Sequence, residues 1–458
     1  MKYMLILMSA FASLAASISN AEAPARFSDL PLNGEVQVFS VQGSNTIGAA
    51  LGPELIRRYL EQKGAEDVTI EPTKVANEVI VSGRVPATLT RVYAKVAAHG
   101  SGTGFVGLAD KSADIAAASR PIKDAEADTL HALGDMRAPE SEHIIGIDGL
   151  AIIVNPNNPI AELSVDEIAQ IFSGGYTDWS QVGGRPGPIH LYARDENSGT
   201  WDSFAGMVLG KRALLQGTRR FESSDELSAV VAEDINGIGF VGLSSVHKSR
   251  LLAVSDGSSK ALKPNKLTVG TEDYALARRL FMYTNAKTEN PYVNEFIDFV
   301  QDDMGQKVVA ETGFVSQELQ AVTPEFYAEL PQDFRDLTVD AQRLTINFRF
   351  QEGSAHLDNK GLQDVERLVS YLQQKGQSEI VLIGFGDRKR SERRAELLSR
   401  LRAMAVRREL VRNGIYPKEA IGYGEQMPIA SLDHEEGKQK NRRVEVWIRQ
   451  PVAPGKNS

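Results

Sequence analysis

The sequence predicts an α/β protein with a large first domain and a smaller α+β domain behind it. Over residues 36–319, short β-type runs alternate with helical stretches, which is typical of an α/β fold with largely parallel sheets. Residues 320–342 interrupt that rhythm with Pro324, Pro331 and a mixture of acidic and polar residues. A second block at 344–449 then opens on an alternating strand, and 458 residues are too many for one ordinary core.

The first block contains strands and helices that the apolar pattern separates clearly. Residues 149–154 form an apolar strand that stops at the turn-forming segment 155–159 (NPNNP). A helix at 53–63 follows a glycine-rich turn. Further strands are expected at 36–41, 68–71, 189–193 and 237–242, and a further helix at 291–302.

The second block begins with a strand at 344–350 in which four apolar side chains alternate with polar ones, so these four are expected to face a core. They are Leu344, Ile346, Phe348 and Phe350. The block continues with a helix at 362–373, a strand at 379–384, an arginine-rich helix at 391–413 and a last strand at 443–449.

The first residues predict export. Lys2 is followed by a short apolar run and by small residues at Ser19 and Ala21, the pattern of a cleavable signal peptide. The alternative is a membrane anchor, but the apolar run is shorter than the roughly 20 residues of a bilayer span. No later segment approaches that length without charges, so no transmembrane segment is expected. The expected divisions are a signal peptide at 1–21, a first domain at 22–325, a linker at 326–342, a second domain at 343–451 and a tail at 452–458.

Charge and composition exclude several classes of function. The net charge of -9 argues against a nucleic-acid-binding surface. The absence of cysteine excludes disulfides, thiolate zinc sites and cysteine nucleophiles. The seven histidines never pair at metal-ligand spacing, so we expect no metal and no cofactor. Ser198 lies in a Ser-Gly-Thr turn rather than a Gly-x-Ser-x-Gly elbow, so no catalytic residue is assigned.

Three Gly/Ser/Thr turns in the first block favour an anion site. They are 43–48 (GSNTIG), 100–104 (GSGTG) and 194–200 (RDENSGT), each between a strand and a helix. Each turn would place hydroxyls and unpaired backbone N–H groups at a helix N-terminus, where the helix dipole favours negative charge. Arg194 adds a planar fork that can hold two oxygens of a tetrahedral anion. One such turn alone is more often a helix cap, but three in one domain favour an oxyanion site.

These turns also carry a family resemblance. Residues 36–319 resemble the phosphate-binding proteins of bacterial ABC phosphate importers, which have a two-lobed type II periplasmic-binding-protein fold. The matching stretches, in the family's order, are 43–46 (GSNT), 100–104 (GSGTG), 118–121 (ASRP), 171–174 (IFSG) with Asp178 and Trp179, and Arg194 with 198–200 (SGT) and Phe204. The resemblance implies that the anion is contacted by Thr46, Ile47, Ser101, Arg194, Ser198, Gly199 and Thr200. It also implies two lobes that close around the anion, with chain crossings near Gly149 and Gly242.

One position departs from the family in a way that matters for selectivity. Some family members carry an Asp directly after the serine that aligns with Ser119, and this Asp accepts the proton that phosphate carries and sulfate lacks. Here Arg120 stands at that position, and a guanidinium cannot accept a hydrogen bond. Arg120 is either an anion ligand or part of a surface ion pair. Asp148, Asp195 and Glu196 are candidates for the missing acceptor, and phosphate remains the expected ligand.

Residues 344–449 resemble the OmpA-like peptidoglycan-binding domain. The matching stretches are 384–387 (GFGD), 398–403 (LSRLRA), 422–425 (GYGE), 428–430 (PIA) and 441–445 (NRRVE). Asp387 lies fifteen positions before Arg402, the family's spacing for the two residues that bind diaminopimelate, whose amino group and carboxylate they complement. Phe385 and Gly386 stand where the family has His-Thr, and Ala395 stands where it has Asn.

The leading hypothesis is a non-enzymatic, periplasmic protein of a Gram-negative bacterium that binds phosphate or a related oxyanion. Peptidoglycan would hold it non-covalently at the cell wall and outer membrane, and an ABC permease is a candidate partner in phosphate transport. One alternative is a phosphatase-type enzyme that uses the same anion cradle. Another is a wall-attached structural or adhesion protein whose ligand site is vestigial.

Overall fold

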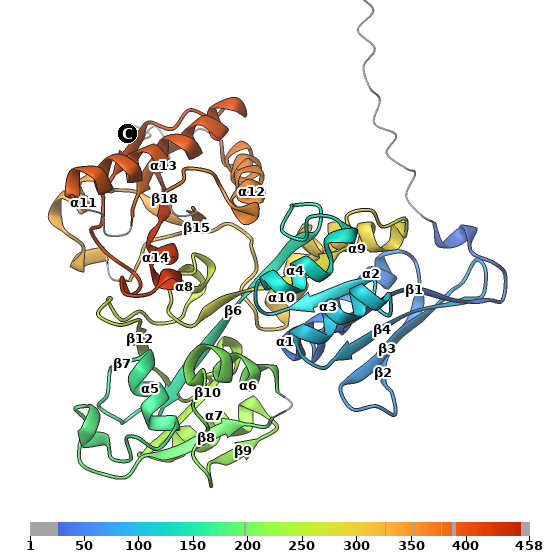
Figure 1. Cartoon of the computed structure of the whole chain (residues 1–458), viewed down its shortest axis with the longest axis horizontal. Coiled ribbons are helices and arrows are strands. Elements are labelled where there is room, and N and C mark those ends of the chain that lie inside the picture. Colours follow the sequence, from blue (N-terminus) through green and yellow to red (C-terminus); the bar gives the residue numbers. More distant parts are fainter. Residues whose placement is uncertain are drawn as a thin grey trace, which may run out of the picture.

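The structure is a computed structural model that describes residues 26–196, 198–325, 327–350, 353–376, 378–386 and 391–449. The expected signal peptide (1–21) and tail (452–458) lie outside these residues. Figure 1 shows three bodies: lobe 1 in blue to cyan with yellow helices, lobe 2 in green, and a C-terminal domain in orange to red. Within the described residues, no helix is long and apolar enough to cross a membrane.

Lobe 1 is a sheet covered by helices on both faces. Its strands are β1 (Glu35–Gly43), β2 (Glu66–Pro72), β3 (Glu78–Val85), β4 (Thr90–Ala98), β5 (Ile115–Ala118) and β13 (Ala277–Thr284). Its helices are α1 (Asn45–Gly48), α2 (Leu51–Gln62), α3 (Ser101–Asp110), α4 (Asp124–Thr129), α9 (Pro291–Gln301) and α10 (Asp303–Glu311). Helix α2 buries apolar side chains at helical spacing, and its Tyr59 packs on Phe296 of α9 with ring centroids 5.4 Å apart.

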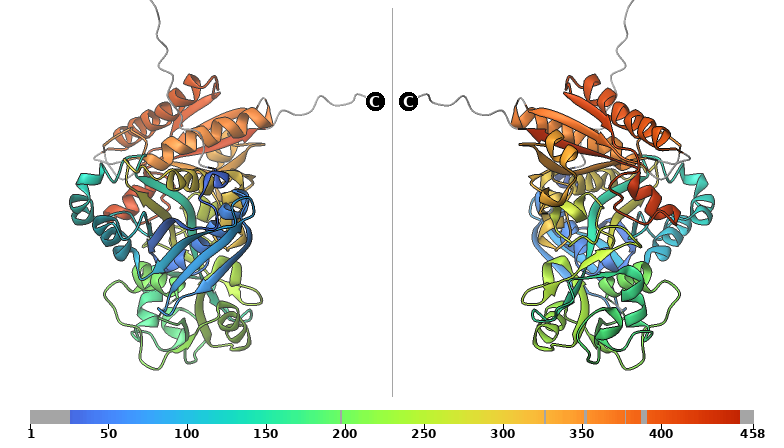
Figure 2. Two further views of the ribbon diagram at one scale, coloured as in Figure 1. Left: turned by 90° about the vertical axis from the view of Figure 1, so that its right-hand side faces the viewer. Right: turned by 90° about the vertical axis from the view of Figure 1, so that its left-hand side faces the viewer.

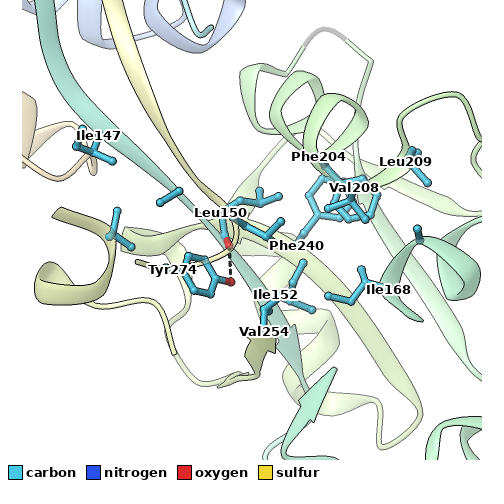
Figure 3. Close-up of a cluster of buried hydrophobic side chains, with 14 of the residues drawn as sticks. Ile147, Leu150, Ile152, Ile168, Phe204, Val208, Leu209, Phe240, Val254 and Tyr274 are labelled. Atoms are coloured by element: carbon cyan, nitrogen blue, oxygen red, sulfur yellow. Dashed lines mark hydrogen bonds between the residues drawn. The ribbon is translucent and has the colours of Figure 1, made fainter. Parts of the chain in front are cut away.

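Lobe 2 is smaller and has an aromatic core. Its strands are β7 (Glu162–Ser164), β8 (His190–Arg194), β9 (Arg219–Phe221), β10 (Gly237–Gly242), β11 (Arg250–Leu251) and β12 (Ala253–Ser255). Its helices are α5 (Val165–Phe172), α6 (Gly199–Phe204), α7 (Ser224–Glu233) and, near the lobe junction, α8 (Lys266–Gly270). Phe204 stacks on Phe240 with centroids 3.9 Å apart, and Tyr274 donates to the Leu150 carbonyl oxygen at 2.9 Å (Figure 3). These contacts fix α6 and the lobe junction to the central strand.

The long strand β6 (Glu142–Val154) joins the two lobes. It pairs with β13 as far as Gly149 and with β10 from Leu150 onwards, so one strand belongs to both lobes. The continuous sheet has the order β2-β3-β4-β1-β5-β13-β6-β10-β8-β9, with β11 also on β6. The second crossing is expected near Gly242, which pairs with Leu150 of β6; further along the chain, β13 pairs with β5 of lobe 1.

The C-terminal domain is an α+β unit. Its sheet has the order β14-β15-β18-β16-β17, with β14 (Ala321–Val322), β15 (Gln342–Arg349), β16 (Glu379–Gly384), β17 (Glu419–Gly422) and β18 (Arg443–Arg449). Its helices are α11 (Gln332–Leu337), α12 (Asn359–Lys375), α13 (Glu392–Arg412) and α14 (Glu435–Asn441). The four alternating residues of the opening strand are buried in its core, as predicted. Helix α11 lies in the segment expected to be a linker, where Phe334 packs against Trp447 with ring centroids 5.6 Å apart.

The two-part architecture confirms the fold class that the sequence predicted, with one difference in the large sheet. The sheet is mixed rather than largely parallel: β1 runs parallel to β4 and β5, whereas β13 and β10 run antiparallel to β6. The β2-β3-β4 strands of lobe 1 are antiparallel as well, and so are the pairings of β6 that join the two lobes. Alternating strand and helix patterns do not reveal these pairings.

Candidate anion and cell-wall sites

The first two glycine-rich turns lie side by side at the ends of β1 and β4. Gly100 N–H donates to the Gly43 carbonyl oxygen at 2.8 Å, and Ser44 N–H donates to the Ala117 carbonyl oxygen at 2.8 Å. Gly43 has φ +135°, and a Cβ there would lie 2.0 Å from the Ala117 carbonyl oxygen. Only glycine fits this position, and it lets α1 and α3 start next to each other.

The third turn meets the first one from the opposite lobe. Thr46 Oγ1 donates to the Gly199 carbonyl oxygen at 3.0 Å across the lobe interface. A Cβ on Gly199 would lie 2.3 Å from Thr46 Cα, so the start of α6 rests directly on α1. The first backbone N–H groups of a helix have no partner within the helix, and the starts of α1 and α6 bring such groups to the lobe interface. At α6, Ser198 Oγ already accepts from two of them, those of Thr200 and Trp201.

A buried serine pair belongs to the second turn. Ser119 N–H donates to Ser101 Oγ at 3.1 Å, and the two hydroxyl oxygens are 3.4 Å apart. Ser44 is also fully buried, and its Oγ has no hydrogen-bond partner among the described residues. The end of lobe 1 that faces lobe 2 therefore holds several small hydroxyl donors.

An arginine that the sequence analysis did not single out lies at the centre of this arrangement. Arg278 on β13 donates through Nε to Asp148 Oδ2 at 3.2 Å, and through Nη2 to Thr46 Oγ1 at 2.8 Å. The same Nη2 also donates to Ser203 Oγ, and Ser203 Oγ donates to Asp148 Oδ2 at 2.8 Å. Arg278 thus connects lobe 1, the strand β6 shared by both lobes, and α6 of lobe 2.

Arg194, the last residue of β8, lies near the start of α6. Its Nη2 donates to the Glu222 carbonyl oxygen at 2.7 Å, its Nε to the Phe221 carbonyl oxygen at 3.2 Å, and its Nη1 to Thr200 Oγ1 at 3.4 Å. Burial lowers the pKa of Arg194 from its ordinary value, although nearby carboxylates act in the opposite direction. Ser198 Oγ caps α6 by accepting from the N–H groups of Thr200 and Trp201.

Arg120 lies at the edge of the same region. Its guanidinium forms two hydrogen bonds to Glu126, at 2.7 and 2.8 Å, and one to the Pro121 carbonyl oxygen at 3.0 Å. Burial alone would raise the pKa of Glu126, but the bond from Arg120 and the local donors outweigh it, and the pKa is lowered. Of the two interpretations of Arg120, this geometry favours the ion pair.

A crevice of about 2060 Å³ opens beside these residues. Ser101, Ser119 and Arg278 line one side of it, and Asp358 and Lys440 of the C-terminal domain line another. Among the described residues, no group of three or more His, Cys, Asp or Glu side chains could hold a metal ion.

The expected cell-wall site centres on Arg402 in α13. Its side chain is 0% exposed, its Nε donates to the Ser354 carbonyl oxygen at 3.2 Å, and its guanidinium lies 5.7 Å from the Phe350 ring centroid. A Cβ on Gly386 would lie 3.5 Å from Arg402 Nη1. Asp387 lies outside the described residues, but the residue directly before it is next to Arg402.

Two departures from the OmpA-like pattern have clear structural roles. Phe385 is fully buried, and the Arg443 guanidinium stacks 3.9 Å from its ring centroid. Ala395, in the first turn of α13, is also buried. Both positions are therefore part of the packing below the expected site.

Comparisons with known proteins follow the same division of the chain. Residues 62–303, more than half of the 458 residues, match the family model described as a PBP superfamily domain. The chain belongs to the PBP superfamily. Residues 349–442 match the OmpA family, so an OmpA domain follows the PBP domain.

Individual relatives carry more specific names. The phosphate-binding protein PstS of Staphylococcus aureus (strain USA300) is 32% identical over 229 residues, which cover 47% of this chain and 67% of that protein. A possible phosphate binding protein from Planctomyces limnophilus is 26% identical with a TM-score of 0.50, covering 62% of this chain and 93% of its own. The peptidoglycan-associated lipoprotein of Burkholderia pseudomallei is 24% identical with a TM-score of 0.22, covering 22% of this chain and 89% of its own.

The PBP domain brings together three of the anion-site residues that the sequence singled out. Thr46, Gly199 and Asp148 lie at the lobe interface, and each forms a hydrogen bond with Arg278 or Ser203. Arg278 and Ser203 were missed because neither belongs to a glycine-rich turn. The signal for Arg278 was present, since two consecutive arginines, Arg278 and Arg279, open an otherwise apolar strand.

Proposed function

We propose that the chain is a binding protein for phosphate or a closely related oxyanion, and not an enzyme. The observation that carries this proposal is the cluster of donors from both lobes around Arg278. A guanidinium and several hydroxyls from the two lobes complement a tetrahedral anion held between them. The phosphate-binding name of the Staphylococcus aureus relative supports the same ligand.

Asp148 is the proposed acceptor for the proton that phosphate carries and sulfate lacks. The contacts from Arg278 and Ser203 both fall on its Oδ2. We assign the recognition of the phosphate proton to its other oxygen, Oδ1, because a carboxylate has acceptor capacity at both oxygens. Arg120 then needs no role in selectivity, since Glu126 already pairs with it.

We assign the OmpA domain to cell-wall attachment. Arg402 supplies the cation for the diaminopimelate carboxylate, and Asp387 the anion for its amino group. The proposed location is the periplasm of a Gram-negative bacterium, after removal of residues 1–21, next to the wall and outer membrane. An ABC permease is the proposed partner in phosphate uptake.

Titration calorimetry of the chain without residues 1–21 tests the first part of this proposal. We expect heat of binding with phosphate and with arsenate, which has the same shape and protonation. Sulfate should bind more weakly, because it has no proton to donate to Asp148. If none of the three anions binds, the oxyanion assignment is wrong. If sulfate binds as tightly as phosphate, the assignment to Asp148 is wrong.

A further inference from the structure

The two domains are joined by a buried polar contact and not only by the chain. Asp273, in the segment that leads back from lobe 2 to β13, is 2% exposed. Its Oδ2 accepts from Arg343 at 2.6 Å and its Oδ1 from Asn347 Nδ2 at 2.7 Å, both on β15 of the C-terminal domain. Arg349, on the same face of β15, donates to the Thr271 carbonyl oxygen at 2.6 Å. The polar face of β15 is thus buried against the PBP domain instead of facing solvent.

A second contact lies on β13 itself. Arg279 donates through Nη1 to Asp358 Oδ2 at 2.7 Å, at the start of α12, and through Nε to Glu272 Oε1 at 2.9 Å. Burial opposes the charged form of Arg279, but the carboxylates of Asp358 and Glu272 outweigh it and raise its pKa. Nearby, Asn359 Nδ2 donates to the Arg137 carbonyl oxygen at 2.5 Å. The start of α12 therefore rests on lobe 1 through charge-assisted contacts.

The docking contact of the C-terminal domain and the contacts of the candidate anion site come from two consecutive residues of β13. Successive side chains of a strand point to opposite faces, so Arg278 and Arg279 reach opposite sides of β13. Arg278 reaches Thr46, Asp148 and Ser203 at the lobe interface. Arg279 reaches Asp358 in the C-terminal domain. Any shift of β13 that releases one of these contacts also moves the other.

The position of the C-terminal domain agrees with coupling between its contacts on β13 and the candidate anion site. In Figure 1 it lies beside the junction of the lobes, with α14 next to α8, and both side views in Figure 2 show it over the same end of the PBP domain. Ser431 N–H donates to Asp256 Oδ2 at 3.1 Å, which ties the C-terminal domain to the segment that follows β12 as well. The domain therefore contacts both ends of the segment through which the chain returns to lobe 1.

We propose that the C-terminal domain sets the anion affinity of the PBP domain, and that Asp358 is a positioning residue that acts through Arg279 on Arg278. The inference rests on the proposed function. Binding between two lobes selects the arrangement in which both sets of donors face the anion, and the measured affinity depends on how populated that arrangement is. A domain docked on the returning segment and on β13 stabilises one arrangement of the hinge and of Arg278.

The coupling between domain docking and anion binding is reciprocal. If docking of the C-terminal domain raises anion affinity by some factor, anion binding must strengthen docking by that factor. The anion should therefore protect the backbone of β15 from exchange, although the hydrogen bonds from β15 to the PBP domain go to Thr271 and Asp273.

Asp358→Asn is the variant that tests this coupling most cleanly. Asp358 Oδ1 caps α12 by accepting from Gly361 N–H at 2.7 Å, and an Asn side chain keeps that acceptor while losing the charge next to Arg279. The control is Glu379→Gln, which removes the exposed ion pairs of Glu379 with Lys418 and Arg449 in the same domain. Both variants are made in the chain without residues 1–21 and checked for an unchanged circular dichroism spectrum.

Phosphate titration calorimetry and hydrogen exchange of residues 342–349, with and without phosphate, give the two measurements. We expect phosphate to bind Asp358→Asn about 5- to 50-fold more weakly than wild type, and Glu379→Gln to bind like wild type. Phosphate should slow exchange of β15 in wild type and in Glu379→Gln, and less so in Asp358→Asn. A role limited to stability would lower the melting temperature and leave both measurements unchanged.

The outcomes separate the inference from the proposed function. If wild type binds none of the oxyanions, the proposed function fails and the inference fails with it. If wild type binds phosphate and Asp358→Asn binds it equally well, the inference alone is overturned. The double variant Arg279→Gln/Asp358→Asn should bind no more weakly than Arg279→Gln, because Asp358 acts through Arg279. Should Arg279→Gln fail to fold, the calorimetry and exchange of Asp358→Asn still decide the question.

Discussion

Replacing Asp273 with Asn tests how strongly the two domains hold each other. The substitution keeps the size of the side chain and removes one negative charge. Arg343 and Asn347 donate to its two oxygens at 2.6 and 2.7 Å. An amide has only one acceptor oxygen, so one of these donors would face an N–H group instead.

The burial of the cluster sets the size of the effect. The Asp273 side chain is 2% exposed and those of Arg343 and Arg349 are 5% and 3% exposed, so charges left unpaired cannot turn to water. Removing one partner of a buried ion pair typically costs about 3–5 kcal/mol. Burial alone would raise the pKa of Asp273, but the charges of Arg343, Arg443 and Arg349 outweigh it and lower the pKa. Its contribution is therefore complete at neutral pH and is lost only as the pH falls below the ordinary Asp value of 3.8.

Urea unfolding followed by tryptophan fluorescence and circular dichroism measures this effect. Trp447 lies opposite Arg343 in the β15–β18 register, so it reports on the C-terminal domain. The control is Glu329→Gln, which removes the solvent-exposed Lys260–Glu329 pair between the same two parts of the chain and should cost less than about 1 kcal/mol. If Asp273→Asn unfolds no more easily than Glu329→Gln, the buried cluster does not hold the domains together.

Three further predictions concern the proposed sites and the pH dependence of stability. Arg278→Met and Arg194→Ala should each weaken phosphate binding by about 2–5 kcal/mol in calorimetry, because a sequestered anion loses a charged partner; wild-type affinity in either variant removes that arginine from the site. Arg402→Ala should abolish most co-sedimentation with diaminopimelate-type peptidoglycan, whereas Arg400→Ala, exposed on the same helix, should not; equal losses that moderate salt also produces would indicate a generic basic contact. Burial lowers the pKa of His143 to about 4, against 6.5 when exposed, so the free energy of unfolding should fall by roughly 2–4 kcal/mol as the pH drops from 6.5 to 4. His143→Gln should lack this part of the pH dependence in thermal melts.

Local patterns in the sequence were sufficient for several strands and helices and for the turns of the candidate anion site. The alternation of Leu344, Ile346 and Phe348 placed these side chains in the C-terminal core, because a strand of period two has one buried face. The glycine-rich turn at Gly43 placed the start of α1, because only glycine allows the close approach to Ala117. Each of these two signals consists of residues that are close together in the sequence, so each can be recognised without the tertiary structure.

Only the tertiary structure decided which residues from distant parts of the chain meet. Arg278 reaches Thr46 and Asp148 because β13 pairs with β6 in the middle of a mixed sheet, and strand pairing over more than a hundred residues leaves no local pattern. The alternation in β15 also left open what lies against its polar face. Arg343 and Asn347 of that face contact Asp273, because the PBP domain covers them. Periodicity determines that a strand has two faces, but what lies against each face depends on how the domains pack.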